Sequence, residues 1–365
     1  MSSDRYPARR TKLAHAIRKA EVSALLVTNP RNVSYLTGFT GEDSYLLIGP
    51  GLTHLFSDSR FETQLQDECP GIPAEIRTSR KAMHDFLAEW LPKFSLSNLG
   101  IESSSMVVAL HDQLAEKLKP LELVAKAGLV EDLRQIKDAD EVAELRVAVY
   151  QAERGFELMR SLILPDQTER QAAHDLEHGM RRFGAIRAAF EPIIAVGDRA
   201  ALPHYRAGSR QFRESGFALV DWGALSPRGY HSDLTRLLVT SKLPPKLVQI
   251  YGVVLKAQQA GIEAIRPGAK CQDVDAAARK VIDQAGFGRY FGHGLGHGIG
   301  LDIHEGPKLS PISTDVLKPG MTVTVEPGIY LPGVGGVRIE DDVLVTRDGC
   351  EVLTTLPKEA PLPAG

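Results

Sequence analysis

The second half of the chain holds seven side chains that can bind metal ions or move protons, in strand-like and glycine-rich stretches. They are Asp221, Asp233, His293, His297, His304, Glu326 and Glu340. Four carboxylates and an imidazole that converge can hold two divalent cations and leave room for a bridging water. Oxygen donors with some nitrogen suit manganese, cobalt or zinc. Paired ions lower the pKa of the water that they share, so the cluster predicts a hydrolase.

Asp221 and Asp233 lie on the two arms of a predicted β-hairpin. Asp221 ends the apolar run GFALV, and Asp233 lies in the returning run YHSDLTRLLVT, after a turn at residues 226–229. A single aspartate at a strand end is usually a cap or turn residue. Two acids that face each other across a hairpin repel, and a cation between them removes that cost. The pair alone leaves both interpretations open.

The run FGHGLGHGIGLDIHEGP has glycine at every second position from 292 to 300. So much glycine disfavours a helix, so His293 and His297 are not expected to form a helical zinc-binding pair. The glycines instead let the backbone pack tightly beside a ligand site. Neither a G-x-G-x-x-G dinucleotide motif nor a P-loop G-K-[ST] occurs here. Three of the chain's 11 histidines in one short run make an incidental glycine-rich loop a poor explanation.

Glu326 in TVTVEPGIY and Glu340 in VRIEDD both lie within otherwise β-forming runs. One buried acid paired with Arg338 would be an ordinary salt bridge. Two such acids after a histidine cluster and a carboxylate hairpin point to metal ligation.

A second motif competes for the metal. His174, Glu177 and His178 match the H-x-x-E-H signature of inverted zinc proteases, on a predicted helix. The neighbours of these residues are charged, at Glu169, Arg170, Arg181 and Arg182. We therefore interpret this segment as the solvated face of a helix.

Composition excludes several classes of partner. Hydrophobic residues make up 43% of the chain and charged residues 24%, with a net charge of −3, so no nucleic-acid or membrane partner is expected. The cysteines at 69, 271 and 350 are far apart, which is typical of reduced thiols in a cytoplasmic protein. No apolar run reaches the ~18 residues of a membrane helix. The basic start lacks the apolar region of a secretory signal, and we interpret it as the first helix of the fold.

The length of 365 residues fits two domains at ~150 residues each. The first third alternates the strand-like runs SALLVT, YLLIG, LTHLFS and NLGIES with helical stretches at 61–67, 81–90 and 111–119, which predicts an α/β domain. From Val130 onward a long amphipathic helix follows, which Pro165 ends, and Thr168 caps the next one. The rest is predicted to be α+β, with helices at 245–265 and 272–284. The predicted domains are 1–132 and 133–365.

With these residues in view, the chain resembles the pita-bread family of metallopeptidases, which includes prolidase, aminopeptidase P, methionine aminopeptidase and creatinase. The strongest motifs are DWGAL…GYHSDLTR, HGLGHGIGLDIHE, KPGMTVTVEPGIY and GVRIEDD. YLTGFTG and FSDSRF resemble the creatinase/prolidase amino-terminal domain. The resemblance implies that this α/β domain precedes a pita-bread catalytic domain.

The resemblance also implies a role for each site residue. The metal ligands would be Asp221, Asp233, His297, Glu326 and Glu340, with Asp233 and Glu340 bridging two divalent ions, manganese first and cobalt or zinc as alternatives. A metal-bridging hydroxide would attack the substrate carbonyl. Glu326 would move the proton to the leaving amine. Further catalytic residues would be His204, His293 and His304 on the substrate side and Arg338 beside the acids.

The spacing from Asp221 to Asp233 is one residue longer than is usual in the family. We expect the extra residue in the turn at 226–229; a bulge between the aspartates would instead rotate one carboxylate away from the metals.

Filled ligand positions and an amino-terminal domain favour cleavage before proline over a creatinase or a plain methionine aminopeptidase. The expected substrate is an Xaa-Pro dipeptide or a short Xaa-Pro peptide, and the expected assembly is a homodimer. Arg206, Arg210 and Arg228 are candidates to bind a dipeptide's carboxylate. Two alternatives stay open: hydrolysis of a non-peptide C–N bond in a small metabolite, and a peptide-binding relative without activity.

Overall fold

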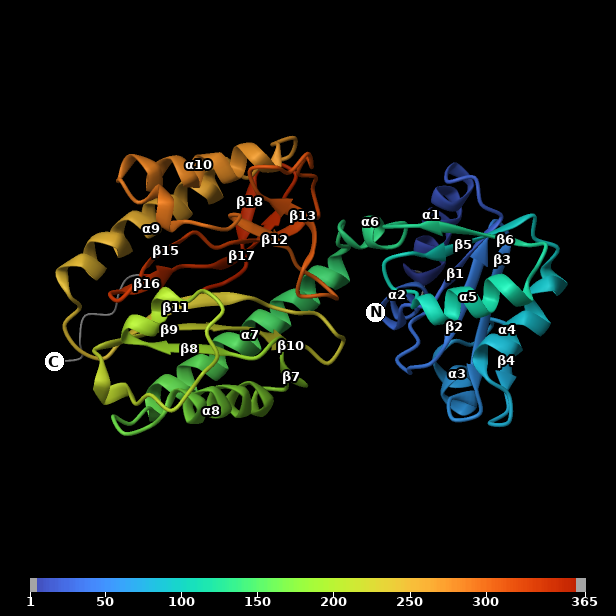
Figure 1. Ribbon diagram of the computed structural model, residues 1–365, viewed down its shortest axis with the longest axis horizontal. Helices are drawn as coiled ribbons and strands as arrows, with labels where there is room; N and C mark the ends of the chain where they lie inside the picture. Colours follow the sequence, from blue (N-terminus) through green and yellow to red (C-terminus); the bar gives the residue numbers. More distant parts are fainter. Residues whose placement is uncertain (1–4, 359–365) are drawn as a thin grey trace. The chain divides into compact units, whose positions relative to one another are not determined.

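The structure is a computed structural model that describes residues 5–358. The chain divides after Arg134 into two compact units, which Figure 1 colours from blue to blue-green and from green to red. Among the described residues, no helix is both long enough and apolar enough to cross a bilayer.

The first unit is built on one mixed sheet of six strands in the order β4-β3-β2-β1-β5-β6. The neighbours β1 and β2, and β2 and β3, run antiparallel, whereas β1–β5, β5–β6 and β3–β4 are parallel. Its elements are α1 (Arg5–Lys19), β1 (Ala24–Val27), α2 (Pro30–Thr37), β2 (Tyr45–Gly49), β3 (Leu52–Asp58), α3 (Glu62–Glu68), β4 (Ala74–Arg77), α4 (Met83–Trp90), η1 (Leu91–Phe94), β5 (Asn98–Glu102), α5 (Val108–Lys117), β6 (Glu122–Lys126) and α6 (Glu131–Arg134).

The predicted α/β character of this unit is confirmed, with β4, β6 and α2 among the elements that were not expected. The strands β4 and β6 were not expected because they are short, polar edge strands, with side chains that are half-buried or exposed. The helix α2 carried a usable signal, since Asn29 caps it and Pro30 occupies its first turn.

The second unit begins with two packed helices, and its described residues form four sheets, two of which have only two strands each, β10-β7 and β15-β16. Its elements are α7 (Ala139–Leu162), α8 (Glu169–Arg182), β7 (Arg187–Ala188), β8 (Ile193–Val196), η2 (Gly197–Ala201), η3 (Phe212–Glu214), β9 (Phe217–Trp222), β10 (Ala224–Leu225), β11 (Leu234–Val239), α9 (Pro245–Ala264), α10 (Cys271–Gln284), η4 (Gly288–Tyr290), β12 (Gly296–Gly298), β13 (Glu305–Leu309), β14 (Thr322–Val325), β15 (Gly328–Leu331), β16 (Gly335–Arg338), β17 (Asp341–Val345) and β18 (Cys350–Val352). The predicted cap of α8 is confirmed, since Thr168 and Gln171 form a capping box.

The strands of the second unit lie between two pairs of helices, with α7 and α8 on one side and α9 and α10 on the other (Figure 1). The order is β11-β9-β8 in one of the two larger sheets and β13-β12-β14-β17-β18 in the other. A bridge between Thr235 and Glu340 joins the two sheets.

Side-chain alternation along β9 explains how the layers form. Ala218, Val220 and Trp222 pack with α7 and α8 in one apolar cluster, whereas Phe217 and Leu219 face the core shared with α9 and α10. Successive side chains of a strand point to opposite faces, so the next residue on the second face is Asp221.

Candidate metal centre

The two aspartates reach the centre through strand alternation. Asp221 shares the inner face of β9 with Leu219, and Asp233, Thr235 and Leu237 share the corresponding face around β11. In the observed register, however, Asp221 pairs with Thr235, so the aspartates are not directly opposed as the hairpin prediction supposed. Asp233 comes just before β11, two residues closer to the turn than Thr235.

The longer hairpin does not turn Asp233 away from the site. Its tip closes through hydrogen bonds from Ser226 N to Tyr230 O (2.8 Å) and from Gly229 N to Ser226 O (2.9 Å). Gly229 has φ +82°, a conformation that glycine adopts without strain. Asp233 still lies in the ligand cluster described below, so no bulge rotates its carboxylate outward.

Both glutamates lie where a predicted strand is interrupted. Glu326 separates β14 from β15, and Glu340 separates β16 from β17. Their backbone N–H groups are held across the fold, by Leu295 O for Glu326 (2.8 Å) and by Thr235 O for Glu340 (3.2 Å). At these breaks the side chains are free of the regular strand alternation, and both carboxylates lie at the candidate metal centre.

The glycine-rich run brings His297 into the same space. A Cβ on Gly296 would lie 2.0 Å from Thr324 O, and one on Gly298 would lie 2.0 Å from Gly306 O. The expected tight backbone packing is therefore confirmed, because no side chain fits at either position. His297 N also donates to Thr324 Oγ1 (3.1 Å).

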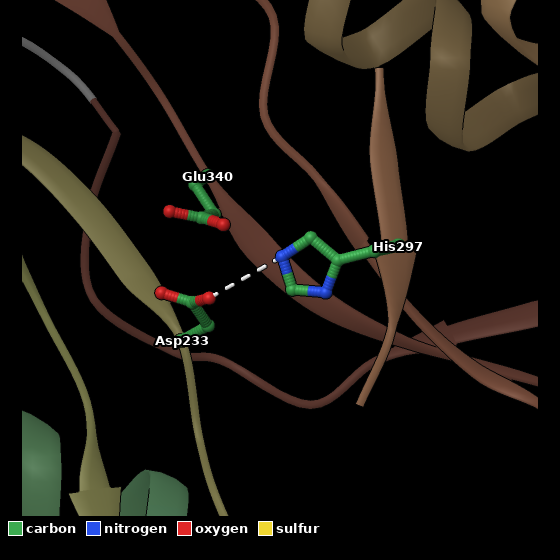
Figure 2. Close-up of side chains that lie close together, drawn as sticks. All are labelled: Asp233, His297 and Glu340. Carbon is green, nitrogen blue, oxygen red and sulfur yellow. Dashed lines mark ion pairs between the residues drawn. The ribbon is translucent and has the colours of Figure 1, made fainter. Parts of the chain in front are cut away.

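Asp233, His297 and Glu340 point toward one another, as Figure 2 shows, with ligand atoms all within 4.8 Å. His297 Nε2 lies 3.6 Å from Asp233 Oδ2 and 3.4 Å from Glu326 Oε1. The other ring nitrogen, Nδ1, contacts Gly298 O (3.0 Å). A carbonyl can only accept, so Nδ1 carries the hydrogen and Nε2 offers its lone pair to a metal.

The charges of the centre also fit divalent cations. Burial raises the pKa of both Asp233 and Glu340 well above their ordinary values, and neighbouring carboxylates raise each further. Burial raises the pKa of Glu326 to about 7, against the opposing charge of Arg338. Burial lowers the pKa of His297 to about 4. The imidazole is therefore neutral at pH 7, and acids that repel one another gain most from a cation between them.

Asp221 is tied to the guanidinium of Arg338. Its Oδ2 accepts from Arg338 Nη2 (2.5 Å), while its Oδ1 is buried and accepts no hydrogen bond from the described residues. Arg338 also donates from Nε to Thr235 Oγ1 (3.0 Å) and from Nη1 to Tyr330 Oη (2.8 Å). Asp221 therefore keeps one buried oxygen for a ligand, and Arg338 holds the orientation of its carboxylate.

His293 is bonded at both ring nitrogens. Nδ1 contacts Gly294 O (2.8 Å) and Nε2 contacts Tyr330 Oη (2.9 Å). Burial lowers the pKa of His293 to about 4 and raises that of Tyr330 to about 12, so the ring is neutral and the phenol donates to Nε2. In this arrangement His293 has no free N–H to donate to a substrate, because its one ring hydrogen points at Gly294 O.

The other two predicted histidines lie at the edge of the centre. The His304 ring packs edge-on against the His297 ring, with centroids 4.4 Å apart, and burial lowers the pKa of His304. His204 is exposed. Burial raises the pKa of Asp221 and lowers the pKa of His293 and of His304, and His204 makes a smaller electrostatic contribution to each. His204 therefore lies near these three side chains.

Three residues of the centre were not singled out from the sequence: Thr235, Thr324 and Tyr330. Thr235 Oγ1 donates to Glu340 Oε2 (2.6 Å) and Thr324 Oγ1 donates to Glu326 Oε1 (3.2 Å). The sequence held a signal for the two threonines. Thr235 follows Asp233 by two residues and Thr324 precedes Glu326 by two, and residues two apart in a strand lie on the same face. The contact of Tyr330 with His293 depends on the tertiary fold.

The competing motif on α8 does not form a metal site among the described residues. His174 and His178 are exposed, and Glu177 Oε1 pairs with Arg181 (2.9 Å) one turn away. The prediction of a solvated helix face is confirmed.

Comparisons with known proteins place this centre in a family. Residues 143–347 match Metallopeptidase family M24, and residues 9–136 match the Creatinase/Prolidase N-terminal domain. An Xaa-Pro dipeptidase of Pyrococcus horikoshii is 34% identical over 349 residues, covering 95% of this chain and 97% of that protein.

Two solved structures are similar to this chain over nearly its whole length. The Xaa-Pro dipeptidase from Bacillus anthracis superposes with a TM-score of 0.93 at 37% identity, covering 98% of this chain and 99% of that one. The X-Pro aminopeptidase from Thermotoga maritima superposes with a TM-score of 0.88 at 31% identity, covering 95% of this chain and 99% of that one. The predicted architecture is confirmed, and the chain belongs to metallopeptidase family M24, with a creatinase/prolidase amino-terminal domain ahead of a pita-bread catalytic domain.

Proposed function

We propose that this metallopeptidase hydrolyses the peptide bond before proline, in Xaa-Pro dipeptides or at the amino terminus of Xaa-Pro peptides. The observation that carries the proposal is the convergence of Asp233, His297 and Glu340 within 4.8 Å, in a chain similar to enzymes named for both activities. Proline's tertiary amide lacks an N–H and has restricted geometry, so its hydrolysis suits a dedicated site.

Five residues would hold two divalent ions, with manganese as the first candidate: Asp221, Asp233, His297, Glu326 and Glu340. Bound ions of this kind supply a water of lowered pKa and polarise the scissile carbonyl. The unpaired oxygen of Asp221 and the lone pair that His297 Nε2 keeps available support the assignment.

The remaining residues would handle the proton and the peptide. Glu326 takes the proton of the attacking water and returns it to the leaving prolyl nitrogen. His304 and His204 donate hydrogen bonds to the substrate, and His293 joins them only in the tautomer or protonation state that puts a hydrogen on Nε2 and releases Tyr330. Arg338 keeps Asp221 oriented. The positive charge of Arg338 also limits the repulsion among the carboxylates.

The test is a parallel assay of the protein loaded with Mn²⁺. Ala-Pro and a longer Xaa-Pro-Xaa peptide are incubated at equal concentrations, with Asp233→Asn as the matched variant and metal content measured for both proteins. We expect hydrolysis of at least one peptide, and loss of both metal and activity in the variant. Failure on both peptides by a fully loaded protein, together with cleavage of a non-peptide amide, would favour the small-metabolite hydrolase. Tight peptide binding without turnover would favour the inactive relative.

We also propose a reducing, cytoplasmic location and a homodimer. The free cysteines support the first, since Cys69, Cys271 and Cys350 form no disulfide. The family resemblance supports the second, and light scattering on purified protein tests it.

A further inference from the structure

Outside the metal centre, one buried carboxylate collects hydrogen bonds from three separate positions. Glu169 is the first residue of α8 and is 0% exposed. Its Oε1 accepts from Val196 N (2.8 Å), and its Oε2 accepts from both Tyr205 Oη and Gly208 N (2.8 Å each). A buried acid with three donors is well satisfied, so removing its charge weakens all three bonds, and replacing one oxygen disturbs the donors on that oxygen.

The segment that Glu169 holds, residues 202–208, is fixed at both ends by other contacts. Before it, η2 packs on β16 so closely that a Cβ on Gly336 would lie 2.1 Å from Ala200 O. After it, the Arg210 guanidinium pairs with Asp198 and Val196 O. The middle of the segment depends on the two bonds to Glu169 Oε2 and on the backbone bond from Arg170 N to Gly208 O (3.1 Å).

His204 is part of this segment. The neighbouring Tyr205 packs its ring against the core and donates its hydroxyl hydrogen to Glu169. These two contacts fix the backbone on one side of His204. On the other side, Leu202 is exposed. The side chain of Arg206 is 88% exposed, and its nearest acid, Glu191, is 4.0 Å away. The direction of His204 therefore depends on the anchoring of Tyr205 and Gly208.

We propose that Glu169 is a positioning residue for His204. It holds the 202–208 segment so that the imidazole faces the substrate side of the metal centre, without itself contacting the peptide. The proposal rests on the proposed peptidase function. A carboxylate is needed because each of its oxygens accepts bonds, whereas glutamine has the same shape but offers an NH₂ donor in place of one oxygen.

The kinetic test is a double-mutant cycle in the whole protein loaded with Mn²⁺. Glu169→Gln should lower kcat/KM for a proline peptide by about tenfold, the size of one lost charge-assisted hydrogen bond. Tyr205→Phe should give a smaller loss, and Glu177→Gln, on the same helix, should give none. If Glu169 acts through His204, adding Glu169→Gln to a His204→Ala protein should lower kcat/KM no further.

A second readout needs no activity. Trypsin can cut after Arg206 only when the segment is loose, so Glu169→Gln and Tyr205→Phe should both speed cleavage there while Glu177→Gln should not. Cleavage at the wild-type rate in both variants would overturn the proposal. An equal loss of kcat/KM with and without His204 would also overturn it, since that indicates a general structural effect. If no proline peptide is hydrolysed by any protein, the proposed function fails, and trypsin alone decides whether Glu169 anchors the segment.

Discussion

At the scale of single residues, each ligand depends on a neighbour that holds it in a state ready for metal. Gly298 O fixes the tautomer of His297, Thr235 holds Glu340, and Arg338 holds Asp221. Such supporting contacts orient ligands and commonly affect metal affinity as strongly as some ligands do.

Thr235→Val should weaken metal binding while preserving the fold. The substitution keeps the shape of the side chain but removes the hydroxyl that donates to Glu340 and accepts from Arg338. We expect a loss of about 10- to 100-fold in Mn²⁺ affinity, measured by titration calorimetry. Thr240→Val is the matched control, because Thr240 is exposed and immediately follows the same strand. Equal affinities in the two variants would show that the hydroxyl contributes nothing.

Glu326→Gln should stabilise the metal-free protein at alkaline pH. The pKa of Glu326 is raised to about 7 by burial, so its contribution to stability is fully present below the pKa of ~4.5 in the unfolded chain and is lost as the pH rises through 7. Glutamine stays neutral and avoids this loss. In chelator, the advantage of the variant should grow by on the order of 2 kcal/mol between pH 5 and pH 8.

Urea unfolding of both proteins at the two pH values measures this difference. Excess Mn²⁺ provides the control, since the wild type should then be the more stable protein. An advantage that stays constant with pH would contradict the assignment of the raised pKa.

At the scale of elements, the centre forms where strands are interrupted. Period-two alternation in FALVD and SDLTRLL was enough to place Asp221 and Asp233 on one face. The cross-strand register was not predictable, because it depends on how many residues the turn absorbs. MTVTVEPGIY and VRIEDDVLVT looked like continuous strands, and only the tertiary fold shows that each breaks at its glutamate. The contact between His293 and Tyr330 likewise joins two elements that the sequence does not pair.

Gly296→Ala tests whether close backbone contact positions His297. The new Cβ would lie 2.0 Å from Thr324 O, whereas one on Gly292 meets nothing within 4 Å. We expect Gly296→Ala to lower stability by about 1–3 kcal/mol and to weaken Mn²⁺ binding, because β12 must move away from β14. Gly292→Ala in the same run should change neither. Thermal unfolding with and without Mn²⁺ measures both effects, and similar behaviour of the two variants would contradict the packing argument.

At the scale of the whole molecule, the chain combines two units of unlike construction, and each carries one of the chain's 2 tryptophans. Trp90 ends α4 in the first unit. In the second unit, Trp222 is fully buried on β9, stacks on Phe156 at 4.3 Å and donates to Ala152 O. Fluorescence can therefore follow each unit separately.

Metal should stabilise only the second unit directly. In Trp90→Phe, the signal of Trp222 should unfold at higher urea when Mn²⁺ is present, by about 2.7 kcal/mol at 100 times the dissociation constant. In Trp222→Phe, the signal of Trp90 should not shift, because the candidate ligands all come from the second unit. Equal shifts in both variants would show that the units unfold as one.

The ion pair between Asp221 and Arg338 affects how the centre behaves when no metal is bound. A buried guanidinium supplies a permanent positive charge among four acids, and the raised pKa of Asp233 and of Glu340 favours their neutral forms when no cation is bound. The chain thus carries a partial internal substitute for its cations. We expect chelation to empty the centre without collapsing it, so that ions can be withdrawn and restored, or one divalent ion exchanged for another, within the same folded protein.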